Sequence, residues 1–154
     1  MNSSASDAAT SLSPGAILLI QLALPLGGFA IGPGEFAIMG LMPNVAADLG
    51  VSEPQVGHVI SAYALGVVVG APVLALLGAR LPRRILLLLL MGCFALGNFA
   101  SALAPSYEPL LIFRFIAGLP HGAYFGIAML VAASMAPPHK RAKAVSRVLA
   151  GLTV

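Results

Sequence analysis

Arg80-Leu81-Pro82-Arg83-Arg84 is the stretch that decides the fold, because it separates two runs of almost entirely apolar residues. Seven of the eight Lys and Arg residues lie either in this stretch or in a second one, Lys140 to Arg147. Membrane proteins alternate apolar spans with short loops, and Lys and Arg concentrate in the cytoplasmic loops. The pattern therefore predicts a membrane protein and the direction in which its spans run.

The composition agrees with a membrane environment. Hydrophobic residues make up 59% of the chain and charged residues 8%, whereas a soluble domain has about 25% charged residues. The isoelectric point near 9.5 does not indicate a nucleic-acid partner, because the basic residues are few and lie beside apolar spans. The lone Cys93 cannot form an intrachain disulfide.

The apolar runs predict an all-α integral membrane protein with spans at residues 16–42, 56–77, 85–103, 110–135 and 144–154. A helix needs about 20 residues to cross the bilayer, so the first four are expected to cross. The fifth has only eleven residues, from Ala144 to Val154, and would leave unpaired carbonyls in lipid. We expect a truncated fifth span and a missing C-terminal half.

The loops also predict the orientation. Residues 79–84 and 136–143 contain Lys and Arg, whereas residues 44–55 and 104–109 contain none. The positive-inside rule then places the amino terminus in the cytoplasm of a multi-pass inner (plasma) membrane protein. Residues 1–15, which are rich in Ser and Ala, are predicted to form a disordered cytoplasmic tail.

The first span has a face of small or polar residues. Gln21, Pro25, Gly28, Gly32 and Glu35 follow one another at steps of four, three, four and three, which places them on one side of a helix. Such a face is expected to point into a bundle or a cavity. A carboxylate within the membrane is costly unless it is paired, so Glu35 is either functional or part of a structural pair.

The fourth span has a matching face. Arg114, Gly118, His121 and Phe125 are spaced four, three and four. At 1.5 Å per residue, Arg114 and Glu35 both lie roughly 7–11 Å below the outer surface. We expect the two to approach each other or to share a water-filled cavity. His121 is either a hydrogen-bonded interior residue or a proton relay, since histidine titrates near neutral pH.

Glycine spacing predicts close contact between helices. Gly66 and Gly70 form one GxxxG pattern, and Gly118, Gly122 and Gly126 form a double one. Small residues at this spacing let helix backbones approach closely. The pattern indicates helix packing and is not specific to transport.

We expect no metal site, no cofactor and no enzymatic activity. His58, His121 and His139 fall in different spans or loops, and one cysteine cannot build a structural zinc site. No glycine-rich phosphate loop follows a strand, and no Ser/His/Asp cluster is visible. A membrane-embedded enzyme is therefore the least favoured of the functions considered, behind a transporter and a structural module.

Several stretches together resemble one family. They are Gly34–Pro43 with Ala46–Val51, Ser61–Gly66, the Arg80–Arg84 loop, and Arg114 with Gly118 and Gly122. This combination resembles the first third of a major facilitator superfamily transporter, in the drug:proton antiporter and arabinose-efflux-like group. The resemblance implies a helical bundle that is part of a twelve-helix protein. It also implies a gating role for the cytoplasmic loop motif Arg80, Arg83 and Arg84, and proton coupling at Arg114.

The chain departs from the family pattern at three loop positions. The family usually has an acidic residue where Ala79 stands, and a glycine where Pro82 and Ala75 stand. The span-five motif that typifies antiporters would come just after Val154.

These observations predict a secondary transporter that exports a small molecule, such as a drug or a sugar, by proton-coupled alternating access. Its proton-coupling and substrate-cavity residues would be Glu35, Arg114, His121 and Gln21. Its partners would be the substrate, protons, the lipid bilayer and the missing half of the transporter. The alternative is a non-transporting four-span structural or assembly module, which a genuine stop directly after the codon for Val154 would favour.

Overall fold

A computed structural model describes residues 13–153, and every regular element in this range is a helix. The elements are α2 (Pro14–Gly40), α3 (Met42–Leu49), α4 (Glu53–Leu77), η1 (Gly78–Arg80), α5 (Arg83–Ala102), α6 (Tyr107–Ser134), η2 (Pro138–Lys140) and α7 (Arg141–Thr153). Four of these helices, α2, α4, α5 and α6, are long and apolar enough to cross a membrane. The all-α helical membrane architecture is therefore as expected.

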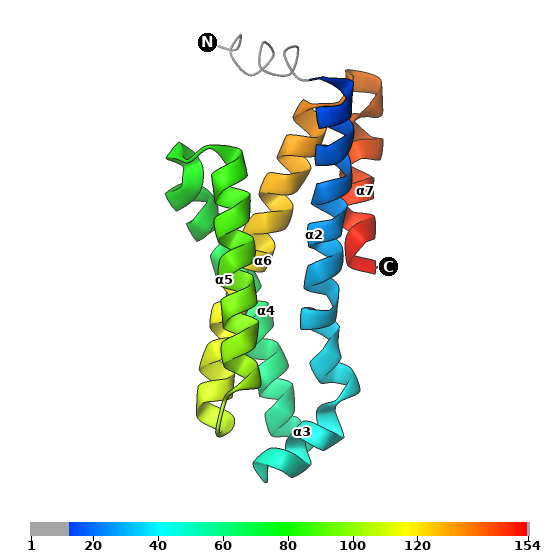
Figure 1. Cartoon of the computed structure of the whole chain (residues 1–154). Coiled ribbons are helices and arrows are strands. Elements are labelled where there is room, and N and C mark those ends of the chain that lie inside the picture. Colours follow the sequence, from blue (N-terminus) through cyan, green and yellow to red (C-terminus); the bar gives the residue numbers. More distant parts are fainter. Residues whose placement is uncertain (1–12, 154) are drawn as a thin grey trace.

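The helices form two groups that meet along α6. Figure 1 shows α4, α5 and α6 packed together, with α2 and α7 side by side next to them. Helix α6 is the most buried of the four long helices and contacts α4, α5, α7 and α2. The side chains of α6 therefore contact neighbouring helices more extensively than those of the other three long helices do.

Basic and acidic residues separate along the bundle. The start of α2, the turn between α4 and α5, and the start of α7 lie at the same end of the molecule, at the top of Figure 1. This end carries the two arginine- and lysine-rich stretches. The opposite end holds α3 and the connection from α5 to α6, with Asp48, Glu53 and Glu108.

Two expectations about the first 50 residues need correction. Helix α2 begins at Pro14, capped by Ser13, whose side-chain oxygen accepts a hydrogen bond from the Ala16 amide at 3.2 Å. The last residues of the predicted tail are thus helical, and residues 1–12 of the tail lie outside the described range. The first span also ends earlier than expected, at Gly40, and residues 42–49 form α3 instead of a loop. The kink falls at Leu41, and α3 ends at Gly50, whose φ of 64° suits glycine.

The remaining helices begin a few residues before the expected spans. Ser52 caps α4, because its backbone amide donates to the Gln55 side-chain oxygen at 2.9 Å, and the helix therefore starts at Glu53 rather than at residue 56. The connection after α4 is a single 3-10 turn that ends at Arg80.

Close packing joins α4 to α6 through glycines on both helices. Gly66 lies against the Phe115 carbonyl and Gly70 against the Leu119 carbonyl, while Gly118 faces the Tyr63 carbonyl. A Cβ atom on Gly122 would lie 2.6 Å from the Val67 carbonyl oxygen, so this position is also too close for a side chain. Gly126, the third glycine of the α6 pattern, has no neighbour within 4 Å of where its Cβ would be and is exposed.

Helix α7 packs along α2 through a second set of close contacts. Gly151 of α7 lies against the Pro25 carbonyl of α2. A Cβ atom on Gly28 would lie 3.1 Å from the Val148 carbonyl oxygen, and one on Gly32 would lie 2.9 Å from that of Leu152. The small residues of α2 were expected to point into a bundle or a cavity, and Gly28 and Gly32 point into the bundle, where they pack against α7.

Candidate functional site

The centre of the candidate site is Arg114, on the buried helix α6. Only 2% of its surface is exposed. Its Nη1 atom donates to the Gly34 carbonyl oxygen of α2 at 2.8 Å and to the Asn98 side-chain oxygen of α5 at 3.2 Å. The one guanidinium therefore joins the consecutive helices α5 and α6 to α2, which is 80 residues away in the sequence at Gly34.

Glycine at position 34 makes this arrangement possible. A Cβ atom there would lie 2.8 Å from the Phe94 ring and 3.3 Å from the Asn98 side-chain oxygen. Without a side chain, α5 can approach α2 closely enough for Arg114 to reach both acceptors. Asn98 is itself held in place, because its amide nitrogen donates to the Phe94 carbonyl at 2.9 Å.

A tyrosine of α4 completes the surroundings of the guanidinium. The Arg114 Cζ atom lies 4.2 Å from the centre of the Tyr63 ring, which is a cation–π contact. The Tyr63 hydroxyl is also hydrogen-bonded to Nδ1 of His121 at 2.9 Å, and the His121 ring packs against Phe125 with 5.3 Å between ring centres. Tyr63 thus connects His121 to Arg114, and all four long helices contribute to the site.

Glu35 lies beside this cluster but is not bonded to Arg114. Among the described residues, no ion pair joins the two side chains, and Arg114 bonds instead to the backbone of Gly34, the residue before Glu35. A carbonyl oxygen with two lone pairs can accept this bond in addition to its helical one. Glu35 and Arg114 were expected to approach each other or to share a cavity. The structure instead joins Arg114 to the α2 backbone at Gly34, and the cavity that Arg114 lines does not include Glu35 among its lining residues.

Several polar atoms of this cluster have no hydrogen-bond partner. They are Oε2 of Glu35 and the Nε and Nη2 atoms of Arg114, and they are the buried side-chain atoms without a partner in the described part of the chain. Unsatisfied buried polar atoms are rare and costly. Here one acceptor oxygen of the anionic Glu35 and two donor nitrogens of the cationic Arg114 remain without partners.

A cavity leads from Arg114 toward the end of the molecule that carries α3. It has a volume of about 440 Å³, and its lining combines apolar residues of α2, α3, α5 and α6 with the polar residues Asp48, Asn98, Ser101 and Arg114. Arg114 and Asn98 are both among its lining residues, so the cavity reaches the guanidinium cluster.

Gln21 does not belong to this cluster. It lies near the opposite end of α2 and lines a separate cavity of about 520 Å³ together with Lys140, Lys143 and Arg147. The helix face that was predicted from its spacing is therefore divided along its length. Gln21 faces the basic end, the glycines seat α7, and Glu35 lies near Arg114.

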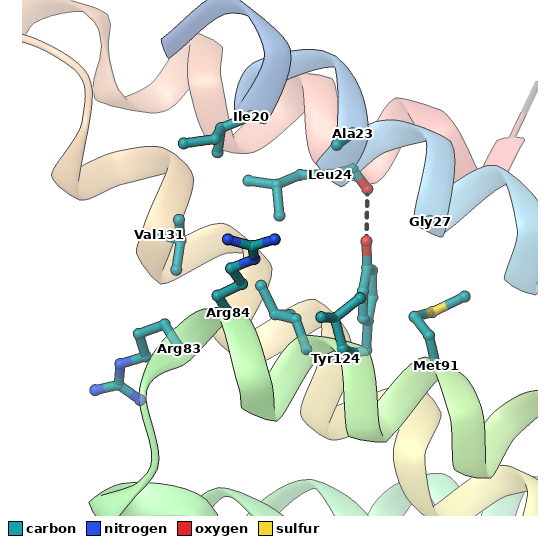
Figure 2. A pocket seen from close by; sticks show the side chains of 11 residues that line it. Ile20, Ala23, Leu24, Gly27, Arg83, Arg84, Met91, Tyr124 and Val131 are labelled. Atoms are coloured by element: carbon teal, nitrogen blue, oxygen red, sulfur yellow. Dashed lines mark hydrogen bonds between the residues drawn. The ribbon is translucent and has the colours of Figure 1, made fainter. Parts of the chain in front are cut away.

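The residues of the cytoplasmic loop motif lie at the basic end. Arg80 ends the 3-10 turn, and Arg83 and Arg84 form the first turn of α5. Both of the latter line a pocket between α2, α5 and α6, which Figure 2 shows at close range.

Sequence reasoning missed two members of the site, Asn98 and Tyr63. Asn98 carries the one side-chain amide in the otherwise apolar segment 85–103, and a polar side chain inside a span is a signal that could have identified it. Tyr63 gave no comparable signal. The described residues contain no group of three or more His, Cys, Asp or Glu arranged to hold a metal ion.

Comparison with known proteins places this sequence in a family. Residues 24–154 match the sequence model of the Major Facilitator Superfamily. The chain belongs to this superfamily.

Similar proteins include the inner membrane transport protein YdhP of Escherichia coli strain K12, which is 50% identical over 133 residues, or 86% of this chain and 34% of the relative. The putative transporter AraJ of the same strain is 44% identical over 135 residues, or 88% and 34%. A chloramphenicol resistance protein of Streptomyces lividans is 37% identical over 125 residues, or 81% and 32%. The chain spans about a third of the length of these relatives.

Proposed function

We propose that the chain forms the first part of a secondary transporter that exports a small molecule in exchange for protons by alternating access. The observation that carries this proposal is that Oε2 of Glu35 and the Nε and Nη2 atoms of Arg114 lack hydrogen-bond partners within membrane-spanning helices. Similarity to an inner membrane transport protein supports transport, and similarity to a chloramphenicol resistance protein supports a drug-like solute; a sugar is the other candidate.

The geometry suggests how a proton would be coupled to movement. Arg114 keeps its bonds to Gly34 and Asn98 while Nε and Nη2 stay free. When Glu35 is ionised, its carboxylate attracts these free donors, and this attraction is strong where water is scarce. When Glu35 takes up a proton, most of the attraction is lost. Protonation of Glu35 would therefore change the distance between Glu35 and Arg114. This change would shift α2 relative to α6.

The proposed orientation puts the basic end of the bundle in the cytoplasm. The cavity that runs from Arg114 toward α3 would then open to the outside, which suits proton entry from the periplasm. In a protein as long as the relatives, the other two thirds would supply the second half, which alternating access between two halves requires. His121 is hydrogen-bonded to Tyr63, and we assign it a supporting role rather than that of a relay.

The test is transport by the full-length protein in proteoliposomes with an imposed pH gradient, across a panel of drugs and sugars. Glu35→Gln should abolish gradient-driven transport, and so should Arg114→Ala. Glu108→Gln is the matched control for the carboxylate, because Glu108 is exposed at the start of α6; it should transport like the wild type. Arg141→Ala, an exposed position on α7, is the control for the arginine.

Stability measurements separate a coupling role from a structural one. Arg114→Ala should destabilise the protein, because it removes the contacts to Gly34, Asn98 and Tyr63 and leaves Glu35 without a nearby cation. The double variant Glu35→Gln with Arg114→Ala should be more stable than Arg114→Ala alone and should still lack gradient-driven transport. Full transport with unchanged pH dependence in Glu35→Gln would show that the carboxylate is not part of the coupling. Robust transport by residues 1–154 alone would favour a small multimeric transporter instead.

A further inference from the structure

Helix α6 holds α2 at two points, and the second lies outside the cluster around Arg114. The hydroxyl of Tyr124 donates to the Leu24 carbonyl oxygen at 2.9 Å, which Figure 2 shows as a dashed line. Glycine at position 27 leaves room for this contact, because a Cβ atom there would overlap the Tyr124 hydroxyl. Tyr124 is buried, so loss of this bond would leave a buried hydroxyl without its partner, which is costly.

The two contacts are equally spaced along both helices. Leu24 and Gly34, whose carbonyls accept the two bonds, lie about 15 Å apart along α2 at the rise of a regular helix. Their donors, Tyr124 and Arg114, also lie about 15 Å apart along α6, in the opposite direction of the chain. Because the spacings match, both bonds form at once, and α6 holds α2 near its middle and again beside Glu35.

A joint separates these two points of α2. It is the sequence Gly32-Pro33-Gly34, directly before Glu35. Pro33 lies inside the helix and has no N–H, so the Phe29 carbonyl lacks its helical hydrogen bond at this turn. Glycine on both sides adds backbone freedom, and helices bend at such positions. The joint therefore allows a change of angle between a first segment, residues 14–31, and a last segment, residues 35–40, which carries the carboxylate.

We propose that Tyr124 is a positioning residue for proton coupling: it fixes the first segment of α2 on α6, so that the last segment alone moves with Glu35 about the joint. The proposal deepens the proposed function and rests on it, because there the proton on Glu35 changes its distance from Arg114. Helix α7, which packs on the first segment, stays in place with it. Without the bond at Leu24, the same change would displace α2 over its whole length.

Distances between spin labels, measured by double electron–electron resonance, test this proposal in the full-length protein. One label pair, at Gly40 and Ser106, joins the ends of α2 and α6 that lie near α3; the other, at Gly15 and Ser134, joins the ends of the same helices at the basic end. Gly15 and Gly40 have no neighbour within 4 Å of where a Cβ would be, so both positions accept a label. Each pair is introduced as two cysteines in a background without Cys93.

Glu35→Gln represents the protonated carboxyl, because it has a similar shape and no charge. It should change the distance between positions 40 and 106 by about 1 Å or more, which is the difference between a charged pair in hydrogen-bond contact and one that is apart. The distance between positions 15 and 134 should stay unchanged. In Tyr124→Phe, which removes only the hydroxyl, the change should appear in both pairs.

Transport gives a second readout. With Glu35 intact, Tyr124→Phe should lower gradient-driven transport about fivefold, as expected for one lost hydrogen bond. Tyr107→Phe, the same substitution in the first turn of α6, is the matched control and should transport like the wild type.

Proline substitutions test the joint separately. Pro33→Ala restores an N–H for the Phe29 carbonyl and should reduce the change between positions 40 and 106. Pro25→Ala makes the same substitution at the other proline inside α2, outside the joint, and should leave that change intact.

Several results would overturn the proposal. Equal changes in both label pairs with Tyr124 in place would show that α2 moves as one rigid rod. An unchanged distance between positions 40 and 106 would show that the joint does not bend. Unaltered distances and transport in Tyr124→Phe would show that its hydroxyl positions nothing. In all of these cases, loss of transport in Glu35→Gln would still support coupling by the carboxylate, whereas full transport in Glu35→Gln would refute the proposed function and this inference with it.

Discussion

Replacement of Gly118 by alanine tests the packing that supports the site. A Cβ atom on Gly118 would overlap the Tyr63 carbonyl oxygen and lie 3.1 Å from the Val67 amide nitrogen of α4. Both neighbours are backbone atoms of a helix, so they cannot rotate away as a side chain would. The two helices must separate, and overpacking of this kind costs about 1–3 kcal/mol.

Gly126→Ala is the matched control, because it makes the same chemical change on the same helix at a position with no neighbour within 4 Å. Alanine favours a helix over glycine by about 1 kcal/mol, and this gain applies equally at both positions. The difference between the two variants therefore isolates the overpacking. Gly118→Ala should have a free energy of unfolding about 1–3 kcal/mol below that of Gly126→Ala.

The assay is reversible unfolding in mixed micelles, followed by circular dichroism as the denaturing detergent is increased. Gly118→Ala should also impair transport more than Gly126→Ala, because movement of Tyr63 disturbs its contact with Arg114, 4.2 Å from the ring centre. Equal unfolding free energies for the two variants would refute the close approach of α4 and α6 at Gly118.

Three further predictions concern the site and its orientation. Asn98→Asp should leave the free energy of unfolding within about 1 kcal/mol of the wild type, because the stronger bond to Arg114 is offset by loss of the amide donor to the Phe94 carbonyl. It should still lower gradient-driven transport about tenfold or more by competing with Glu35. Tyr63→Phe, which removes only the hydrogen bond to His121, should cost about 1 kcal/mol in unfolding free energy; Tyr63→Leu should cost about 2 kcal/mol more, because it also removes the cation–π contact. Single cysteines, in a background without Cys93, should react with impermeant reagent from the periplasm at Ser52 and Ser106, and from the cytoplasm at Ala79 and Ala142; labelling of position 142 from outside would reverse the orientation.

The long helices could be predicted from the sequence because each is an uninterrupted apolar run between short polar loops. The segment 85–103 and the observed α5, Arg83–Ala102, differ by one or two residues at each end. The break at Leu41 was missed because residues on both sides of it are equally apolar. Only the later Pro43, in the first turn of α3, marked a new helix start.

The charged members of the site could be predicted, and their partners could not. Arg114 and Glu35 are the charged residues inside the four full-length apolar runs, which identifies them without any knowledge of the fold. Asn98 and Tyr63 became visible only once the structure showed which sides of α5 and α4 face α6. In helices that are apolar on all sides, hydrophobic periodicity carries little information about rotation.

The face of α2 shows why spacing alone overestimates a functional surface. Its small residues share one side of the helix, but α7 covers Gly28 and Gly32 through backbone contacts, while Arg114 bonds to the Gly34 carbonyl further along. A stripe of small residues therefore indicates that another group lies close to the helix. That group can be the backbone of a second helix, as with α7, or a long cationic side chain, as with Arg114. What distinguishes Glu35 from the rest of the stripe is a buried oxygen that no neighbour satisfies. Because such an atom is costly unless it gains a partner, the proposed coupling would bring the Glu35 carboxylate to the free donors of Arg114, a movement for which the packed glycines have no counterpart.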